Sequence, residues 1–367
     1  MKKILIGIIM DGKAGGVDRY ILNFFDVIKH EDVHVDFLTN HITASLQEKL
    51  AKDNAQLFEV ATLTHPVQQY KQVFDLVKAN GYDTVYFNVS TAITFPGVMA
   101  ARKAGASRVL VHSHNSSFDS EQEIKRKIMI TLHELSKPFI CKYATEFYSC
   151  SDKAAQWLFT KKVMDSGRVQ YVQNAIDTRN FSFSQEKRDK IRSELNIADK
   201  FVVGHVGNML YQKNHFFLID AFKKLSEMDS SAVLVLIGDG VRQEAIRERV
   251  KDLGLSDKVL MLGRINTADG YMSAFDVFAL PSIFEGMPIV SVEAQCTKLP
   301  CVFSDTITRQ AEISNMCKFV PIDDPKVFAQ ALYECKKLDR AQMVLTKSLD
   351  AFDFNNQREL FKQIANV

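Results

Sequence analysis

Short apolar runs alternate with longer amphipathic stretches along most of the chain. The runs have the length of buried strands, and the stretches between them repeat apolar residues at helical spacing. This alternation predicts an α/β protein whose helices are wound around parallel sheets. In the first half we expect strands at residues 4–10, 33–38, 84–87, 108–112, 146–151 and 169–173, and helices at 17–29, 67–80, 97–104 and 121–143.

The alternation breaks after residue 173 and then restarts. A polar, charged segment runs to Lys200, and further strands are predicted at residues 201–206, 232–237, 258–262, 277–280 and 300–303. We therefore expect two Rossmann-like halves, at residues 1–176 and 177–350, and a helical segment at 351–367. Ligands of open parallel sheets bind beyond the carboxyl ends of the strands, so two such halves facing each other would form a deep cleft.

Composition and charge exclude few classes of protein. Among 367 residues, 46 Lys and Arg balance 44 Asp and Glu, which gives a formal net charge of +2. This balance leaves no global field to recruit nucleic acid, so any bound anion must be held by a local site. The six cysteines form no CxxC pair and have no histidine at zinc spacing. We expect reduced, mostly buried thiols and a cytoplasmic protein.

The first apolar run imitates a signal peptide. It is short, however, and continues directly into Asp11 and a glycine loop, so a buried first strand fits better. No stretch of 18 or more continuous apolar residues follows, so no bilayer-spanning segment is predicted.

A first candidate site is the glycine-containing loop at residues 11–16. Gly15 and Gly16 carry no side chain where the backbone could approach a ligand, and the helix that follows offers free N–H groups to a phosphate or carboxylate. The loop lacks the GxGxxG spacing of a dinucleotide site, so a single anion contact is favoured. A merely permissive turn is the alternative.

A second candidate is the loop at residues 207–215. Lys213 lies near the start of the following helix, where its ammonium could meet phosphate oxygens. A solvated lysine at a helix start is the alternative.

The third candidate, at residues 282–293, is the sharpest. Pro288 suits the first turn of a helix, and Gly286 lets the backbone come close to a ligand. Glu285 in the entry loop and Glu293 in the helix body could both reach a ligand lying across the helix start, and a carboxylate accepts hydrogen bonds from sugar hydroxyls. Helix capping by Glu285 is the alternative.

Together these motifs resemble retaining GT-B glycosyltransferases, specifically glycosyltransferase family 4. The matching features are the E-x7-E pattern in FEGMPIVSVE, the GxxxxxKNH loop, the IGDG turn at residues 238–240, the pair of Gly263 and Arg264, and the early Gly-Gly. They follow the family order from the first strand to about Asp305, and the HSHN segment at residues 112–115 resembles bacterial capsular and exopolysaccharide members. The resemblance implies a GT-B fold, with an acceptor-binding N-terminal domain, a donor-binding C-terminal domain and a last helix that crosses back to the N-terminal domain.

The resemblance also implies roles for individual residues. The catalytic positions would be Glu285, contacting the donor sugar, Lys213, neutralising the diphosphate, and His114, facing the reacting sugar. His114 could instead only shape the end of its strand, and His112 is expected to be structural. Glu293 would bind the ribose. The remaining donor-binding positions are Gly15, Gly16, Asn208 and Gly238, then Arg264 and Ile265 beside the base, and Gly286, Met287, Pro288, Ile289 and Val290 around the diphosphate.

The implied activity is transfer of a hexosyl unit, with retention, from a nucleotide sugar to a lipid-linked or growing surface polysaccharide. A UDP-sugar is the expected donor, a glycan or lipid-linked saccharide the expected acceptor, and no nucleic acid is expected. The leaving diphosphate gains negative charge, which Lys213 and the helix start before Glu293 would stabilise. The chain contains no Asp-x-Asp pair, so we expect neither a metal nor a cofactor.

One position departs from the family. Many members have arginine where this chain has Asn208, and the loss of a guanidinium removes a potentially bidentate phosphate contact. A catalytically silent subunit that binds and stabilises an active partner is therefore an alternative. A nicotinamide-dependent dehydrogenase is a third hypothesis, weakened by the missing GxGxxG spacing.

The helix predicted at residues 121–143 could bring the protein to the inner face of the membrane. It places a basic group beside an apolar group, as peripheral membrane helices do. Ordinary packing against the sheet is the alternative. The residues concerned are Lys125, Arg126, Lys127, Ile128, Met129, Ile130 and Leu132. We also expect a domain hinge near residues 174–179.

Overall fold

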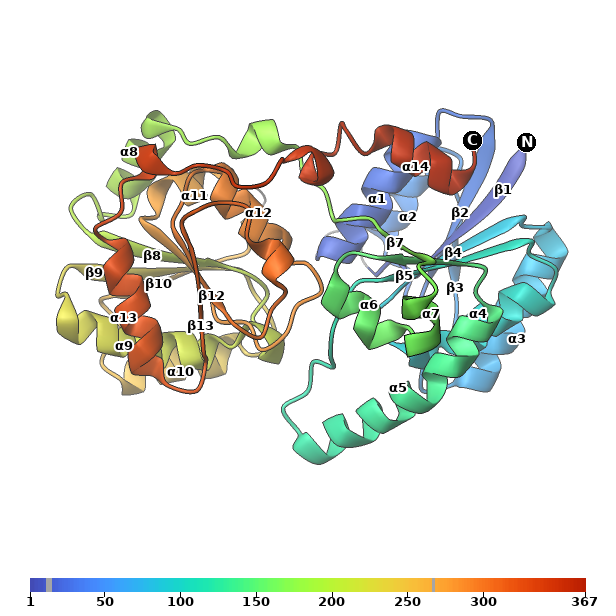
Figure 1. Cartoon of the computed structure of the whole chain (residues 1–367), viewed down its shortest axis with the longest axis horizontal. Coiled ribbons are helices and arrows are strands. Elements are labelled where there is room, and N and C mark those ends of the chain that lie inside the picture. Colours follow the sequence, from blue (N-terminus) through green and yellow to red (C-terminus); the bar gives the residue numbers. More distant parts are fainter. Residues whose placement is uncertain (11–14, 266–267) are drawn as a thin grey trace. The chain divides into compact units, whose positions relative to one another are not determined.

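The computed structural model describes residues 1–10, 15–265 and 268–367, which divide into two compact units (Figure 1). Unit 1 comprises Met1–Phe118, Gln122–Ala175 and Phe354–Val367, and unit 2 comprises Asp119–Glu121 and Ile176–Asp353. The chain thus enters unit 2 near Ile176 and returns to unit 1 near Phe354.

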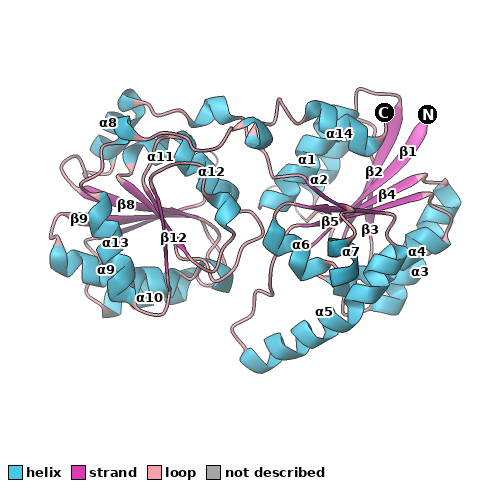
Figure 2. Ribbon diagram, in the orientation of Figure 1, coloured by secondary structure: helices cyan, strands magenta, loops and turns pink. Residues whose placement is uncertain are grey.

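Unit 1 is built on a parallel sheet that has seven strands among the described residues, in the order β3-β2-β1-β4-β5-β6-β7 (Figure 2). The strands are β1 (Lys2–Gly7), β2 (Val33–Thr39), β3 (Leu57–Glu59), β4 (Thr84–Val89), β5 (Arg108–Ser113), β6 (Glu146–Ser149) and β7 (Val169–Tyr171). The helices are α1 (Gly16–Ile28), α2 (Ala44–Ala51), α3 (Pro66–Asn80), α4 (Phe95–Lys103), α5 (Glu123–Tyr143), α6 (Asp152–Leu158), α7 (Lys161–Asp165) and α14 (Arg358–Ala365).

Both faces of this sheet are buried, as side-chain alternation in β1 shows. Ile4 and Ile6 pack in a core with residues of α1 and α14, whereas Leu5 between them packs in a second core with residues of α3, α4 and α6. Successive side chains of a strand point to opposite faces, so a parallel strand covered on both sides reads as a continuous apolar run. This pattern is what made β1 recognisable in the sequence.

Unit 2 contains a second parallel sheet, with six strands among the described residues, in the order β10-β9-β8-β11-β12-β13. The strands are β8 (Phe201–Val206), β9 (Ala232–Ile237), β10 (Val259–Gly263), β11 (Val277–Leu280), β12 (Cys301–Ser304) and β13 (Cys317–Val320). The helices are α8 (Gln185–Glu194), α9 (His215–Met228), α10 (Gln243–Asp252), α11 (Asp269–Ala274), α12 (Ile289–Cys296) and α13 (Pro325–Cys335). The predicted α/β class with two Rossmann-like domains is confirmed.

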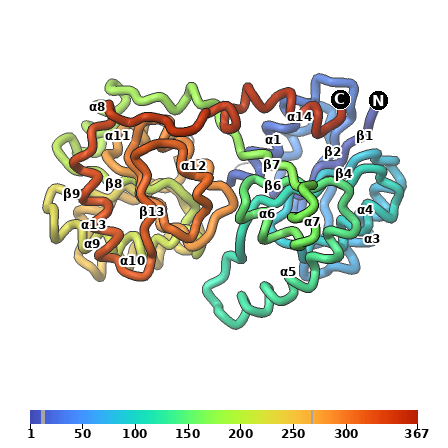
Figure 3. Tube along the Cα trace, in the orientation of Figure 1, coloured from blue at the N-terminus to red at the C-terminus, as the bar shows by residue number. Residues whose placement is uncertain are grey.

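The last helix packs in unit 1, where the two chain ends lie beside each other (Figure 3). Phe361 of α14 contacts Phe24 of α1, with ring centroids 5.3 Å apart. Lys2 Nζ donates to the carbonyl oxygen of Asn366, and Arg108 donates to that of Ile364. The C-terminal segment is therefore part of the unit 1 core.

Several element boundaries differ from the sequence predictions. The first strand ends at Gly7 instead of residue 10. Beyond it the Ile9 amide still donates to Leu38 O, whereas the Met10 amide donates to Asp18 Oδ1 at 3.0 Å. The last helix begins at Arg358 instead of residue 351, which lies in a short 3-10 turn. The short strands β3 and β13 were not predicted.

The polar segment before Lys200 is more ordered than its composition suggests. It contains α8, whose Arg188 and Arg192 bind Asp276 and donate to the last carbonyls of α11. Cations at a helix C-terminus satisfy its free carbonyl groups and oppose its dipole. Ion pairs and hydrogen bonds of charged residues thus attach α8 to the end of α11, because α8 has few apolar residues.

Candidate active site

Two loops beyond the carboxyl ends of β8 and β9 are packed together through glycines. Gly238 has φ +136°, and a Cβ there would lie 2.1 Å from the carbonyl oxygen of Gly207. A Cβ on Gly240 would lie 2.7 Å from the carbonyl oxygen of Met209, whose amide donates to Asp239 O at 2.7 Å. Any side chain at either glycine would push these loops apart. The IGDG turn therefore holds the loop after β8 in place.

The loop after β8 positions Lys213 in a buried ion pair with Glu285. Lys213 Nζ lies 2.6 Å from Glu285 Oε1, although 72 residues separate them, and the two side chains are 15% and 8% exposed. A Cβ on Gly207 would lie 3.0 Å from Lys213 Cε, so the glycine makes room for the lysine stem. Two residues from separate sequence motifs thus meet at one point.

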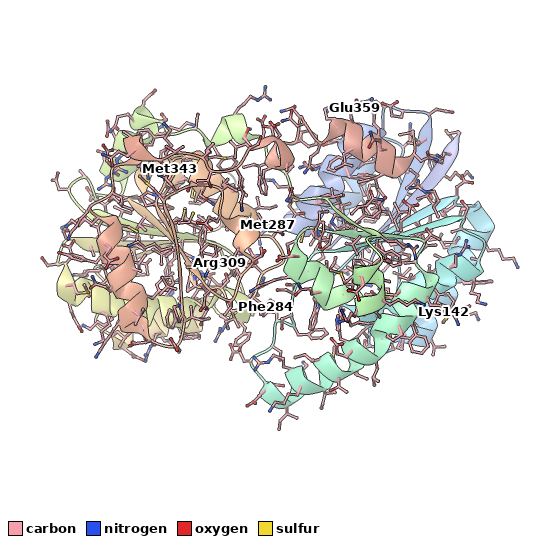
Figure 4. The ribbon with its side chains drawn as sticks, in the orientation of Figure 1. Lys142, Phe284, Met287, Arg309, Met343 and Glu359 are labelled. Carbon is pink, nitrogen blue, oxygen red and sulfur yellow. The ribbon has the colours of Figure 1, made fainter. Side chains whose placement is uncertain are left out.

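Gln212 binds the other side of Glu285. Its Nε2 donates to Glu285 Oε2 at 2.9 Å and to Phe284 O at 3.0 Å, and its carbonyl accepts the Ile283 amide at 2.8 Å. Both carboxylate oxygens of Glu285 are therefore held, which fixes the segment between β11 and α12. Phe284 and Met287 mark this segment in Figure 4.

The helix α12 begins immediately after this segment. Pro288 is its N-cap, and Ile289 and Val290 are its first residues, so the helix itself has no carbonyl for their amides. The N-terminus also carries the positive end of the helix dipole. Glu293 lies one turn further on and is 4% exposed. An anion at this helix start would meet free amides and positive potential.

Arg264 and Asp239 form a second, more exposed ion pair. Arg264 donates from Nε and Nη2 to the two carboxylate oxygens of Asp239, at 3.0 and 2.9 Å. This fork joins the loop after β10 to the IGDG turn. Ile265 follows Arg264 and is half-buried. Both residues lie at the carboxyl edge of the unit 2 sheet.

Two buried histidines lie close to Lys213. His205 Nδ1 lies 2.8 Å from the Ala279 carbonyl, and its ring is 4.6 Å from that of His215. Burial lowers the pKa of His205 to about 4 and that of His215 well below its usual value, with Lys213 adding to both shifts. Both histidines are neutral at pH 7, so Lys213 is the cation at this point.

The carboxyl edge of the unit 1 sheet is built from neutral side chains. His114 Nε2 lies 2.9 Å from Asn88 Oδ1, and Tyr86 links His112 Nδ1 and Tyr20 through hydrogen bonds of 2.8 Å each. The rings of His112 and His114 are 4.0 Å apart. Burial lowers the pKa of His114 to about 3 and that of His112 well below its usual value. The described side chains around His114 are thus polar groups without formal charge.

Gly15 and Gly16 lie at the start of α1 in the same unit. Gly15 has φ +110°, which disfavours any other residue, and Gly16 is the first helical residue. The remainder of the predicted loop, residues 11–14, lies outside the described residues.

In the described part of the chain, no group of three or more His, Cys, Asp and Glu side chains could hold a metal ion. No described helix combines the length and apolar composition needed to cross a membrane.

Comparisons with known proteins identify the family of this chain. A family model described as "Glycosyltransferase Family 4" matches residues 14–180, and one described as "Glycosyl transferases group 1" matches residues 187–346. A Bacillus subtilis protein named glycosyltransferase EpsF is 30% identical over 316 residues, covering 85% of this chain and 81% of the relative. The chain belongs to glycosyltransferase family 4.

Further relatives are consistent with this family. An Escherichia coli UDP-Gal:alpha-D-GlcNAc-diphosphoundecaprenol alpha-1,3-galactosyltransferase is 28% identical over 300 residues, covering 79% of this chain and 76% of the relative. The Anabaena HepE structure with UDP-glucose matches with a TM-score of 0.77 at 18% identity, and sucrose-phosphate synthase from Thermosynechococcus elongatus with 0.76 at 18%. The HepE match covers all of both chains, and the synthase match covers 100% of this chain and 98% of the synthase. These structures identify the fold as GT-B.

In this glycosyltransferase the donor-binding positions implied by the resemblance are grouped by element. Asn208, Gly238, Arg264 and Ile265 lie in the loops after β8, β9 and β10, whereas Gly286, Met287, Pro288, Ile289, Val290 and Glu293 lie in or before α12. The structure brings Lys213 and Glu285 into direct contact. Their roles towards a ligand stay predictions.

The sequence reasoning missed Asn88 and the bond from Gln212 to Glu285. Asn88 interrupts the apolar strand TVYFNV near its carboxyl end, and such an interruption is a readable signal. Gln212 gave no comparable signal, because its contact depends on how two distant loops fold.

Proposed function

We propose that this glycosyltransferase moves a hexosyl unit from a UDP-sugar to a lipid-linked or growing surface polysaccharide, with retention of configuration and without a metal. The observation that carries the proposal is the buried Lys213–Glu285 pair in the unit that also presents the start of α12. The E. coli relative is named for a diphosphoundecaprenol-linked acceptor and UDP-galactose, and the HepE structure contains UDP-glucose; both support the choice of substrates.

The proposed chemistry is mainly electrostatic. The anomeric C–O bond of the donor breaks while the acceptor hydroxyl attacks on the same face. The UDP diphosphate leaves with both electrons of that bond, and its leaving oxygen takes the proton of the acceptor hydroxyl. Lys213 and the amides of Ile289 and Val290 stabilise the growing negative charge, because fixed donors in a partly buried site cost no reorganisation. Glu285 accepts hydrogen bonds from the donor sugar, and Glu293 accepts them from the ribose.

In the free protein Glu285 and Lys213 are paired with each other. A donor diphosphate would give Lys213 a stronger anionic partner and allow Glu285 to turn to the sugar hydroxyls. Until then the pair keeps two partly buried charges compensated, which avoids an isolated buried charge. Arg264 and Ile265 are proposed to lie beside the base, and Gly16 to approach the diphosphate.

A donor panel followed by a turnover assay tests the proposal. We expect UDP-sugars to raise the melting temperature of the purified chain more than GDP- or dTDP-sugars. We also expect slow donor hydrolysis, insensitive to EDTA, that Glu285→Ala abolishes while Glu244→Ala on α10 leaves it unchanged. Donor binding without hydrolysis or transfer would instead favour the silent-subunit alternative, and a shift with NAD alone would favour a dehydrogenase.

The helix α5 supports a peripheral location of the protein at the membrane, where a lipid-linked acceptor would lie. Ordinary packing accounts for its buried residues, His133, Ser136 and Ile140. It does not account for an exposed apolar stripe on the same helix, whose spacing of three and four residues places it on one face. The stripe consists of Ile124, Ile128, Leu132, Leu135 and Phe139. Lys125, Arg126 and Lys127 add positive charge, which anionic lipid headgroups attract.

Sedimentation with liposomes tests this location. Vesicles containing anionic phosphatidylglycerol should bind the protein, and Ile128→Glu with Leu135→Glu should abolish binding. Val67→Glu is a matched control, because Val67 is 82% exposed on another helix of the same unit. Binding that survives the α5 variant would contradict the proposal.

A further inference from the structure

Three buried polar side chains lie at the carboxyl edge of the unit 1 sheet. Asn88 belongs to β4, His114 follows β5, and Asn174 follows β7; their exposures are 4%, 6% and 5%. His114 Nε2 lies 2.9 Å from Asn88 Oδ1. Asn174 lies beside the His114 ring closely enough to influence its pKa.

The bond to Asn88 determines which nitrogen of His114 carries the proton. An amide oxygen only accepts hydrogen bonds, so His114 Nε2 must be the N–H that donates to it. A neutral imidazole has one proton, which leaves Nδ1 with a bare lone pair. Burial lowers the pKa of His114 to about 3, and Asn174 offsets only part of this shift, so the neutral form prevails at pH 7.

Each of the three residues also has a buried polar atom without a hydrogen bond in the described structure. Among the described residues, His114 Nδ1, Asn88 Nδ2 and Asn174 Oδ1 are buried without a hydrogen-bond partner. Buried polar atoms are almost always paired, so a group of unpaired ones indicates a bound molecule that is absent from the free chain. His114 Nδ1 and Asn174 Oδ1 are both acceptors, which suit the hydrogen of a hydroxyl group.

We infer that Asn88 is a positioning residue for glycosyl transfer: it holds His114 in the Nε2–H tautomer, so that Nδ1 accepts a hydrogen bond from a hydroxyl of a sugar substrate. This inference rests on the proposed function for the identity of the hydroxyl. Asn174 Oδ1, which is also buried and unpaired, is a second acceptor at this edge of the sheet. The opposite orientation of the Asn88 amide would place a proton on Nδ1 and remove the acceptor.

The neighbours of His114 within unit 1 do not obscure its titration. His112 and Tyr20 have ring centroids 4.0 and 5.1 Å from that of His114. Burial lowers the pKa of His112 and raises that of Tyr20, so both are neutral between pH 5.5 and pH 8. A new titration in this range after a change at Asn88 would therefore report His114.

Nitrogen-15 NMR of histidine-labelled protein tests the tautomer directly, without any substrate. With His114→Gln used to assign the signals, we expect the wild-type His114 Nδ1 to show the shift of an unprotonated acceptor and Nε2 that of an N–H. Asn88→Leu should mix the two tautomers. A wild-type His114 with the proton on Nδ1 would overturn the inference.

Kinetics provide a second test. A purely structural role of Asn88 would not change the pH profile of the activity. Asn88→Leu should lower kcat of donor hydrolysis about 10- to 100-fold, the cost of one lost hydrogen bond in the transition state, with donor KM nearly unchanged. Asn88→Asp places a carboxylate on His114 Nε2, which favours the imidazolium and raises the His114 pKa. The variant should therefore lose activity as the pH falls from 8 to 5.5, whereas the wild type should show no such acid limb from His114.

Ser90→Asp is the matched control, because it adds the same charge to an exposed position just beyond β4. Its pH profile should match that of the wild type. An Asn88→Asp profile identical to the Ser90→Asp profile would overturn the inference, even if Asn88→Leu failed to fold. A wild-type chain that turns over no donor defeats the proposed function but leaves the NMR test of the tautomer intact.

Discussion

The carboxyl edges of the two sheets are built in different ways. Around His114, the described edge of unit 1 is a network of neutral side chains, in which Asn88, Tyr86 and two histidines hydrogen-bond or stack on one another. The edge of unit 2 is formed by loops in close backbone contact, which carry the buried pair of Lys213 and Glu285 and the more exposed pair of Arg264 and Asp239. The first kind of edge suits hydroxyl groups, and the second suits an anion.

The difference follows from what each ligand requires. A sugar hydroxyl is recognised by donors and acceptors at fixed positions, and bulky side chains that pack on each other supply that rigidity. A diphosphate requires positive charge and free amides, which become available only where the backbone itself comes close. Glycines are therefore essential in unit 2, whereas the proposed site of unit 1 depends on side chains.

Removal of the Lys213 charge should have the largest effect. We expect Lys213→Ala to lower kcat of donor turnover about 1,000-fold, because it removes the cation that faces the leaving diphosphate. Lys213→Arg, which keeps the charge, should retain more activity than Lys213→Ala. Lys223→Ala on α9 is the control for an ordinary lysine and should be indistinguishable from wild type. Steady-state kinetics decide the point, and equal activity of Lys213→Ala and wild type would refute the role of Lys213.

Addition of one methyl group should have almost as strong an effect and tests the close backbone contact of the unit 2 edge. Gly238→Ala would place a Cβ against the Gly207 carbonyl, so we expect it to lower the free energy of unfolding by about 3 kcal/mol or more. Gly254→Ala is the matched control: it also has positive φ, at +66°, but nothing lies within 4 Å of its Cβ. It should cost only about 1 kcal/mol from backbone strain. Similar losses for both variants in urea titrations would mean that the close contact is unimportant.

The fold could be predicted from the sequence because its signals are local. Ile4, Leu5 and Ile6 read as a strand covered on both faces, and the structure buries them in two separate cores. Strand and helix ends were less predictable. Met10 is apolar, yet its backbone amide binds Asp18, so the end of β1 depends on a contact that no periodicity reveals.

The candidate site could be predicted only in part, for a similar reason. Glu285 and Lys213 were visible as members of separate motifs, but their direct contact arises from the packing of Gly207 and Gly238. The partner of His114 was not visible at all. Asn88 is 26 residues away and reaches it only because β4 and β5 are neighbours in the sheet.

Acidification should destabilise unit 1 more than unit 2. Unit 1 contains three buried histidines with a lowered pKa among its described residues, His112, His114 and His133, whereas unit 2 contains His205 and His215. A histidine whose folded pKa is lowered is fully stabilising above its unfolded pKa of about 6.5, and stability falls as the pH drops below it. From pH 7 to pH 5 each should cost about 2 kcal/mol.

The single tryptophan allows the two units to be followed separately. Trp157 stacks on His133 in unit 1, so its fluorescence reports unfolding of that unit, whereas circular dichroism reports both. The fluorescence transition should move to lower urea at pH 5 by more than the remaining transition. His112→Gln should reduce that excess, and the exposed His30→Gln should not. A larger acid shift for unit 2 would contradict the comparison.

Restoration of a guanidinium at Asn208 should have the smallest effect and tests how complete the charged edge is. Many members of the family carry arginine there, and Asn208 lies in the same tight loop as Gly207, with its carbonyl accepting the Leu210 amide at 2.8 Å. Asn208→Arg adds a cation that can bind phosphate oxygens in a bidentate manner, so we expect UDP-sugar affinity to rise about tenfold. Asn208→Lys should give a smaller gain, and Asn196→Arg, after α8, none. Isothermal titration would measure all three variants, and an Asn208→Arg affinity no higher than wild type would mean that Lys213 and the start of α12 already satisfy the diphosphate.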